Sequence, residues 1–282
     1  SVKRLLKRSP LGLLLLPRRF HAYCVGPAKS GTVSVKAMFS TRYRADHEAA
    51  FLEVVEMAIA RLEGRLSTAD ARRRLRRWDR ERRLEMDSFN QLGVFARELA
   101  AEFPRAKFVL TVRQPRSWLR SILNQHLRVD LSNRPAERRL RELFFRPAGV
   151  PCSPGEEELE RLGLFPVEGY LRGWSNHVER VLDGVPADRL LVVPTDELSS
   201  SADRLAAFLS IRPETIDTER SHMHRAPRDF GVFERLPEGL VEEAVHRCCS
   251  AVLTRISARL EAQAGGPTAV AGNGPAREPS PR

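Results

Sequence analysis

The chain is poor in cysteine and in long apolar runs, and each scarcity excludes a class of protein. Its 282 residues include four cysteines and no Cys-x-x-Cys pair; they are Cys24, Cys152, Cys248 and Cys249. This spacing offers no structural zinc site, and we expect reduced thiols in a cytoplasmic enzyme. The apolar run over residues 11–16 is far shorter than the roughly 20 residues of a membrane span.

The N-terminal segment, residues 1–19, carries positive charge and no acidic residue. Its cations are Lys3, Arg4, Lys7, Arg8, Arg18 and Arg19. Its basic and then apolar order resembles the start of a signal peptide, but Pro17 and two arginines follow where a small-residue cleavage site would be needed. Two interpretations stay open: a helix that packs on the following domain, or a basic segment that makes peripheral contact with a membrane surface.

The net charge of +11 suits an anionic cofactor or an acidic surface. A second cationic block runs from Arg72 to Arg83, with only Asp79 and Glu81 as acidic residues. No helix-turn-helix, zinc-finger or RNA-recognition signature accompanies this charge, so we expect no nucleic acid partner. A helix with a solvated, arginine-rich face is the simpler explanation of the block.

The stretch from Tyr23 to Thr32 carries the clearest chemical signal. Its sequence, Tyr-Cys-Val-Gly-Pro-Ala-Lys-Ser-Gly-Thr, is a short apolar run and a glycine-bounded loop ahead of a helical pattern. This order exposes backbone N–H groups and Lys29 at a helix N-terminus, where a phosphate or sulfate is best held. The loop is not a P-loop, because Thr32 and Val33 follow Gly31 in place of Lys and a Mg²⁺-binding hydroxyl.

A second motif follows a predicted strand over residues 108–113. The strand Phe-Val-Leu-Thr-Val-Arg ends in Arg113, Gln-Pro-Arg-Ser starts a helix, and Ser121 lies eight residues after the arginine. Together with Gly-x-x-Lys-Ser-Gly-Thr, this motif resembles the sulfotransferases that use 3′-phosphoadenosine 5′-phosphosulfate (PAPS), most closely the bacterial-type small ones. Two further similarities are Phe-Pro-x-Ala-Lys-Phe from Phe103 and the strand with an acidic turn over residues 189–198.

The resemblance implies a PAPS-dependent sulfotransferase. Such an enzyme moves the sulfuryl group of PAPS to a hydroxyl of a glycan, lipid or small-molecule acceptor and releases adenosine 3′,5′-bisphosphate (PAP). The implied cofactor-binding residues are Gly26, Pro27, Ala28, Lys29, Ser30, Gly31, Thr32, Arg113, Ser121 and Arg225. Arg113 and Ser121 would hold the 3′-phosphate. The Arg-Lys-Gly signature of the animal cytosolic branch is absent, and Arg225 or Arg228 could substitute for it. We expect no metal, because a sulfuryl group carries less charge than a phosphoryl group.

Sulfuryl transfer needs a cation at the leaving phosphate and a base for the acceptor hydroxyl. The resemblance makes Lys29 the cation. The base is His47 or Glu48: a histidine ordinarily titrates near neutral pH, whereas the family offers precedent for a glutamate. A structural reading is also open, in which Asp46 caps the next helix and Glu48 lies in its first turn. Asp87, His126, His177, His222 and His224 are weaker candidates.

Hydrophobic patterning predicts an α/β fold. Strands are expected over residues 20–25, 108–113 and 190–193, and helices over 33–40, 48–62, 72–83, 89–103, 167–182, 202–209 and 236–264 and after residue 117. This alternation indicates a three-layer, P-loop-like fold with a central parallel sheet flanked by helices, and ligands at the carboxyl ends of the strands. We expect one domain over residues 20–264, loops with short helices over 128–165 that cover the acceptor, and a disordered tail over 265–282.

Two other functions stay open at this point. One is a P-loop-type kinase of nucleotides or small molecules, although the loop lacks the spelling that holds Mg²⁺. The other is a non-catalytic, nucleotide-binding scaffold of the same fold. A scaffold need not bind PAP, whereas a sulfotransferase must.

Overall fold

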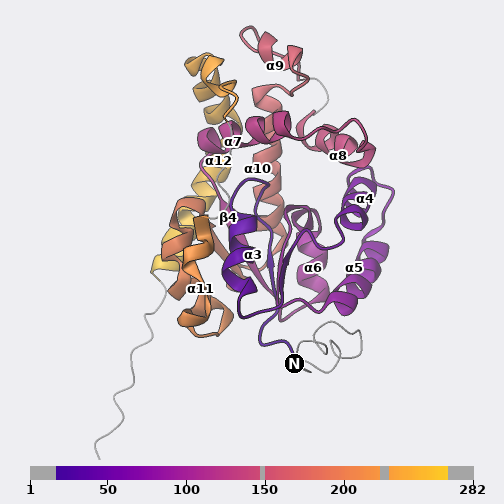
Figure 1. The fold of residues 1–282 in the computed structure, drawn as a ribbon, viewed down its shortest axis with the longest axis vertical. Helices are drawn as coiled ribbons and strands as arrows, with labels where there is room; N and C mark the ends of the chain where they lie inside the picture. The colour runs from indigo at the N-terminus through magenta and orange to yellow at the C-terminus, as the bar shows by residue number, and fades with distance from the viewer. Residues whose placement is uncertain (1–16, 147–149, 223–228, 266–282) are drawn as a thin grey trace, which may run out of the picture.

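A parallel sheet of five strands forms the centre of the molecule (Figure 1). We describe residues 17–146, 150–222 and 229–265 of a computed structural model. The strand order is β2-β3-β1-β4-β5, and every neighbouring pair is parallel. The strands are β1 Ala22–Cys24, β2 Ala45–His47, β3 Met86–Ser88, β4 Lys107–Val112 and β5 Leu190–Pro194.

Helices cover both faces of this sheet. They are α3 Thr32–Ser40, α4 Phe51–Leu62, α5 Thr68–Arg82, α6 Ala96–Glu102, α7 Pro115–Arg128, α8 Pro135–Phe145, α9 Glu157–Arg161, α10 Val167–Gly184, α11 Ala202–Leu209 and α12 Glu238–Ala264. Short 3₁₀ turns include η1 Asn90–Phe95, η3 Thr195–Ser200 and η5 Thr218–His222. No helix of the described part of the chain is long and apolar enough to span a membrane.

Side chains of the central strands alternate between two cores. Tyr23 and Phe108 point into the larger core, which α4 to α8, α10 and α12 help to form. Cys24 and Val109 point into a smaller core with α3 and α11. Because successive side chains of a strand face opposite sides, this pattern buries both faces of the sheet. The predicted three-layer α/β fold is therefore confirmed.

Two strands and several helix boundaries differ from the prediction. The helix predicted over residues 89–103 is the 3₁₀ turn η1 followed by the shorter α6, and α5 begins at Thr68 instead of residue 72. The strands β2 and β3 were not predicted, because each has only three residues and carries polar side chains. The helix predicted from residue 48 begins at Phe51, since Glu48 and Ala50 have left-handed backbones with φ of 58° and 50°. The helix-cap interpretation of Asp46 is wrong: Asp46 lies in β2, and its carboxylate accepts a hydrogen bond from the His47 amide at 2.8 Å.

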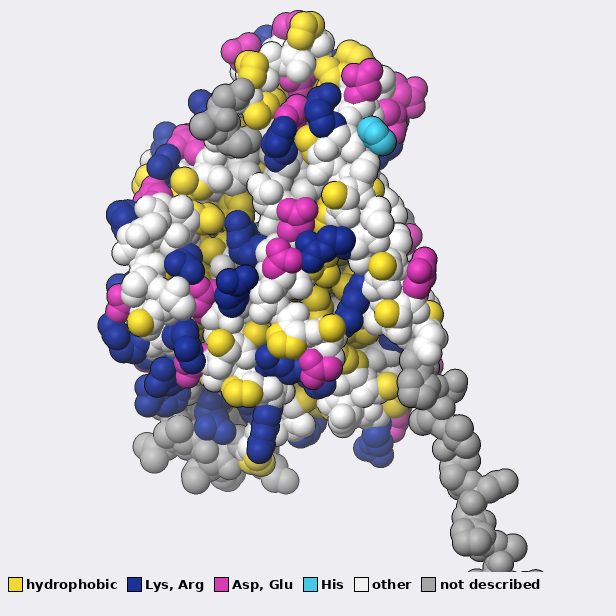
Figure 2. Space-filling view, turned by 180° about the vertical axis from the view of Figure 1, so that it is seen from behind, with side chains coloured by type: hydrophobic (Ala, Val, Ile, Leu, Met, Phe, Trp, Pro, Cys, Tyr) yellow, Lys and Arg dark blue, Asp and Glu magenta, His cyan; other side chains and the backbone are white. Residues whose placement is uncertain are grey.

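The segment expected to hold only loops and short helices also contains the regular helix α8, residues 135–145. The arginine block forms most of α5, as predicted. On the side shown in Figure 2, Lys and Arg side chains gather at the lower left, over the α5 region. Several arginines of α5 pair with acidic residues, for example Arg76 with Glu102 at 2.7 Å and Arg77 with Glu81 at 2.8 Å. Nearly all of the tail predicted over residues 265–282 lies outside the described residues.

A buried carboxylate joins α5 to the first strand. Asp79 accepts hydrogen bonds from Arg18 at 2.7 and 2.9 Å and from the Tyr23 hydroxyl at 3.1 Å. Burial alone would raise the pKa of Asp79, but hydrogen bonds from His21 and Arg18 outweigh it and lower that pKa to about 2. The ion pair therefore stabilises the folded state wherever Asp79 is ionised.

We predict that Asp79→Asn lowers the free energy of unfolding at pH 7 by about 2 kcal/mol. The pKa of Asp79 is depressed in the folded state, so its stabilisation is complete above the unfolded-state value and is lost as the pH falls toward 2. Urea unfolding of both proteins between pH 7 and pH 2.5 should show a difference that narrows below about pH 4. A difference that stays constant over this range contradicts the assignment.

Candidate active site

The loop between β1 and α3 ends in an open helix N-terminus. The helix begins at Thr32, its N-cap Gly31 has a left-handed backbone with φ of 98°, and no side chain caps it. The first amides of a helix have no acceptor within that helix and carry the positive end of its dipole. The loop can therefore hold an anionic group by its backbone.

Gly26 lets this loop lie directly against the neighbouring strand. A Cβ atom at Gly26 would lie 2.0 Å from the Thr111 hydroxyl oxygen and 2.4 Å from the Thr111 carbonyl oxygen. The backbone of β4 cannot yield at such distances, so the position requires glycine. Lys29 has a left-handed backbone as well, with φ of 67°.

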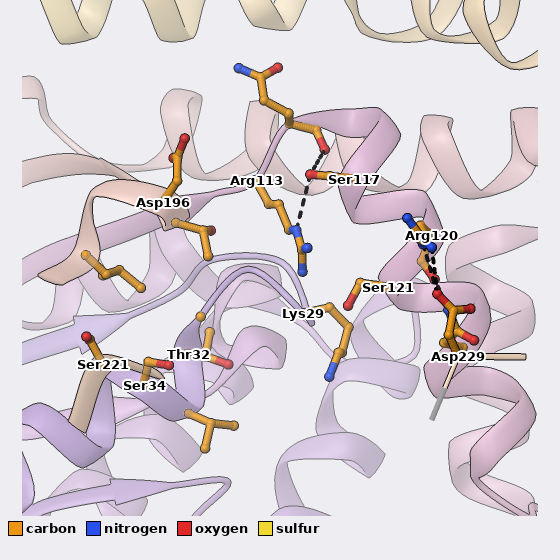
Figure 3. Close-up of a pocket in the computed structure, with 16 residues that line it drawn as sticks. Lys29, Thr32, Ser34, Arg113, Ser117, Arg120, Ser121, Asp196, Ser221 and Asp229 are labelled. Atoms are coloured by element: carbon orange, nitrogen blue, oxygen red, sulfur yellow. Dashed lines mark hydrogen bonds and ion pairs between the residues drawn. The ribbon is translucent and has the colours of Figure 1, made fainter. Parts of the chain in front are cut away.

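The loop and the second predicted motif line one cavity of about 530 Å³. Figure 3 shows Lys29 and Ser121 extending into it, with Arg113 on the adjacent wall. Arg113 follows β4, and Ser121 lies in α7. These two residues therefore meet the loop that carries Lys29, which is far from them in the sequence. The volume lies in the range of small-molecule and cofactor sites.

Three cations line this cavity, and two of them, Lys29 and Arg113, form no ion pair with the described residues, whereas Arg120 pairs with Asp229. Burial lowers the pKa of Lys29, and the charges of Arg128 and Arg113 lower it further. Burial and the charge of Arg120 likewise lower the pKa of Arg113, against the opposite effect of Asp196. The Arg113 Nε atom donates a hydrogen bond to the Ser117 hydroxyl at 3.2 Å. An anion in this cavity would relieve the repulsion between these cations.

The two candidate bases lie beside the loop, at the end of β2. The Nε2 atom of His47 lies 3.2 Å from the Thr32 hydroxyl, and Glu48 Oε1 lies 4.0 Å from the same Nε2. Neither residue is among those that line the cavity. Burial raises the pKa of Glu48, and the negative charge of Glu137 on α8 raises it further. Burial and Glu137 thus shift the pKa of Glu48 in the direction that makes its carboxylate a better base.

Other predicted residues have varied placements. The Ser30 side chain is fully buried and donates to the Pro27 carbonyl at 2.6 Å, so it shapes the loop from within. Arg225 lies outside the described residues. Asp87 is buried in β3, and burial with the charge of Asp46 raises its pKa well above the ordinary value. Asp87 does not line the cavity.

Of the later candidate histidines, His126 and His177 are packed, and the side chains of His222 and His224 lie outside the described part of the structure. His126 bonds the Tyr170 hydroxyl at 2.8 Å, and His177 Nε2 donates to the Val25 carbonyl at 2.8 Å. Burial lowers the pKa of His177 to about 4, so its ring is neutral at physiological pH. Among the residues that the structure describes, no three His, Cys, Asp or Glu side chains are grouped to hold a metal ion.

The sequence analysis did not assign several residues of the cavity wall. Thr195 and Asp196 follow β5 and lie in the acidic turn that had signalled the family resemblance. Asp229 accepts from Arg120 at 3.0 Å and from Asn124 at 3.0 Å, which fixes residue 229 against α7. The spacing of four residues between Arg120 and Asn124 was the available signal, since it places both on one helix face.

We predict that Gly26→Ala lowers the free energy of unfolding by more than about 2 kcal/mol, because the added methyl group overlaps the β4 backbone. A matched control is Gly239→Ala in the first turn of α12, where a Cβ atom meets nothing within 4 Å. Denaturant unfolding should show a large loss for the first variant and none for the second. Equal stabilities of the two variants would contradict the close approach of the loop to Thr111.

Comparisons with known proteins gave one family match and two solved structures of low similarity. Residues 23–213 match the sulfotransferase domain family. A sulfotransferase from Alicyclobacillus acidocaldarius is 22% identical with a TM-score of 0.45; the match covers 88% of this chain and 96% of that one. The sulfotransferase domain of the Synechococcus PCC 7002 olefin synthase is 12% identical with a TM-score of 0.38, over 88% and 95%.

A search of curated proteins found no match. At their low identities and TM-scores, the two solved structures support no conclusion about substrate. The domain match covers more than half of the chain and includes the loop, Arg113 and Ser121. The kinase alternative has no such support. The chain belongs to the sulfotransferase domain family and is a PAPS-dependent sulfotransferase.

Proposed function

We propose that the cavity binds PAPS with its phosphosulfate on the loop and its 3′-phosphate at Arg113 and Ser121. The observation that carries this proposal is that Lys29 and Arg113 line the same cavity from different elements. Two unpaired cations match two anionic groups of one ligand. Arg225 is a further candidate for the 3′-phosphate on family resemblance alone.

The bound PAPS supplies the sulfuryl group, which passes to an acceptor hydroxyl. The half-buried Lys29 ammonium stabilises the negative charge that grows on the leaving phosphate. The amides of the first turn of α3 assist by their fixed orientation. We propose that no metal is needed. A sulfuryl group carries less charge than a phosphoryl group, and Lys29 with these amides is sufficient to stabilise it.

The base is proposed at the end of β2. His47 or Glu48 accepts the hydroxyl proton, and their separation of 4.0 Å allows one to orient the other. The raised pKa of Glu48 makes its carboxylate a stronger base than that of an ordinary glutamate.

The acceptor is proposed to be a hydroxyl-bearing glycan, lipid or small molecule. The helix α8 packs against α4, which begins three residues after Glu48. On α8, Glu137 and the half-buried Arg141 are one helical turn apart, and burial lowers the pKa of Arg141. Both charges suit a polar acceptor. Residues 1–19 remain our candidate for peripheral membrane contact, and the four free cysteines suit the proposed cytoplasmic location.

We predict that Arg113→Ala weakens PAP binding at least about tenfold, the usual loss when a charge-assisted hydrogen bond is removed. Arg116→Ala is the control: Arg116 lies three residues further along, in α7, where it pairs with Glu238 and Glu242 of α12 and does not line the cavity. Titration calorimetry of both folded variants measures the effect. If Arg113→Ala binds PAP with unchanged affinity, the 3′-phosphate does not bind at Arg113. If the wild-type protein does not bind PAP, the proposed binding of PAPS in this cavity is wrong.

A second prediction distinguishes the two bases. The true base should lose about two to four orders of magnitude in turnover when replaced, in Glu48→Gln or His47→Ala. If Glu48 is the base, activity falls as the pH drops through its raised pKa. Glu137→Gln removes one cause of that raised value, so it should shift the acidic limb of the pH–rate profile to lower pH.

Glu142→Gln is the matched control, since Glu142 lies on the same helix and pairs with Arg139. An acidic limb that does not respond to Glu137→Gln, with turnover lost only in His47→Ala, assigns the base to His47. Normal rates in both base variants would exclude the end of β2 from proton transfer.

A further inference from the structure

The carbonyl oxygens of the phosphosulfate loop are held by side chains from several elements. Four hydrogen bonds do this, and we call them the loop tethers. They run from Ser30 Oγ to the Pro27 carbonyl (2.6 Å), from Trp118 Nε1 to that of Ala28 (2.7 Å), from Thr195 Oγ1 to that of Ser30 (2.7 Å), and from Ser88 Oγ to that of Thr32 (2.6 Å).

Each tether also fixes the direction of the backbone N–H of the next residue. A trans peptide is planar, so the carbonyl of one residue and the N–H of the next point in opposite directions. The Trp118 tether therefore directs the Lys29 N–H away from the indole. Trp118 is 1% exposed within the larger core and does not line the cavity, whereas Lys29 does. An amide turned away from the core is available to an anion in the cavity that Lys29 lines.

The Lys29 backbone is the part of the loop that most needs such a tether. Its left-handed φ of 67° is unfavourable for a residue with a side chain, and a rotated 28–29 peptide would relieve it. Rotation would present the Ala28 carbonyl to the anion in place of the Lys29 amide. The indole bond opposes this rotation, because rotation would leave the buried indole N–H without an acceptor and turn the Lys29 N–H, another donor, toward it.

We propose that Trp118 is a positioning residue for the anion site: its indole N–H holds the Ala28–Lys29 peptide with the amide toward the 5′-phosphate. This role rests on the proposed function, in which the loop holds the 5′-phosphate and Arg113 the 3′-phosphate. The two ends of the site can be separated with two ligands. PAP has a phosphate for each end, whereas adenosine 3′-phosphate lacks the 5′-phosphate that the loop would bind.

The experiment measures the dissociation constants of PAP and adenosine 3′-phosphate by calorimetry and takes their ratio as the contribution of the loop. Trp118→Phe should reduce the preference for PAP about tenfold, the worth of a hydrogen bond to a buried group, and leave the affinity for adenosine 3′-phosphate unchanged. The control is Trp174→Phe, which removes an equally buried indole whose Nε1 has no hydrogen-bond partner. It should retain the wild-type preference.

Replacing Trp118 with β-(3-benzothienyl)alanine tests the same bond without loss of volume, and it serves if Trp118→Phe does not fold. A preference for PAP that either Trp118 variant retains would overturn the role of Trp118. An equal loss of affinity for both ligands would also overturn it, because that is the effect of general damage to the fold. A wild-type protein that binds both ligands equally would reject the proposed function itself, and the inference with it.

Discussion

The site depends on the direction of a few peptide bonds between β1 and α3. An anion can be held by backbone amides only if the neighbouring carbonyl oxygens point elsewhere and have partners there. The loop meets this condition by lying against β4, which Gly26 permits, and by hydrogen bonds from side chains of β3, α7 and η3. The parallel sheet brings these elements together because the carboxyl ends of its strands share one edge.

Electrostatics complete what the backbone begins. Lys29 and Arg113 are partly buried. Burial lowers the pKa of each, and the positive charges of nearby arginines lower it further. Repulsion and burial make such a cluster of cations unfavourable without a ligand. A bound bisphosphate would offset both effects, so the cluster favours binding. In the proposed binding mode, the Lys29 charge lies where the leaving phosphate develops negative charge, so the same residue would contribute to affinity and to catalysis.

Local signals in the sequence predicted the central part of this site, while its supports depend on distant contacts. The loop and the Arg113 motif were recognisable because their residues are contiguous or at a fixed helical spacing. The strands β2 and β3 were not, since three polar-containing residues show no β pattern. The left-handed Glu48 moved the start of α4, and the contact of Trp118 with Ala28 joins residues 90 positions apart. Only the tertiary fold determines such contacts.

The most direct test is a crystal structure of the protein with PAP. The account predicts the 5′-phosphate within hydrogen-bonding distance of the Lys29 ammonium and the first-turn amides of α3. It also predicts the 3′-phosphate at Arg113 and Ser121, with the Ala28 carbonyl still bonded to Trp118. PAP bound in the reverse orientation, or a loop with the Ala28 carbonyl turned toward the ligand, would contradict it.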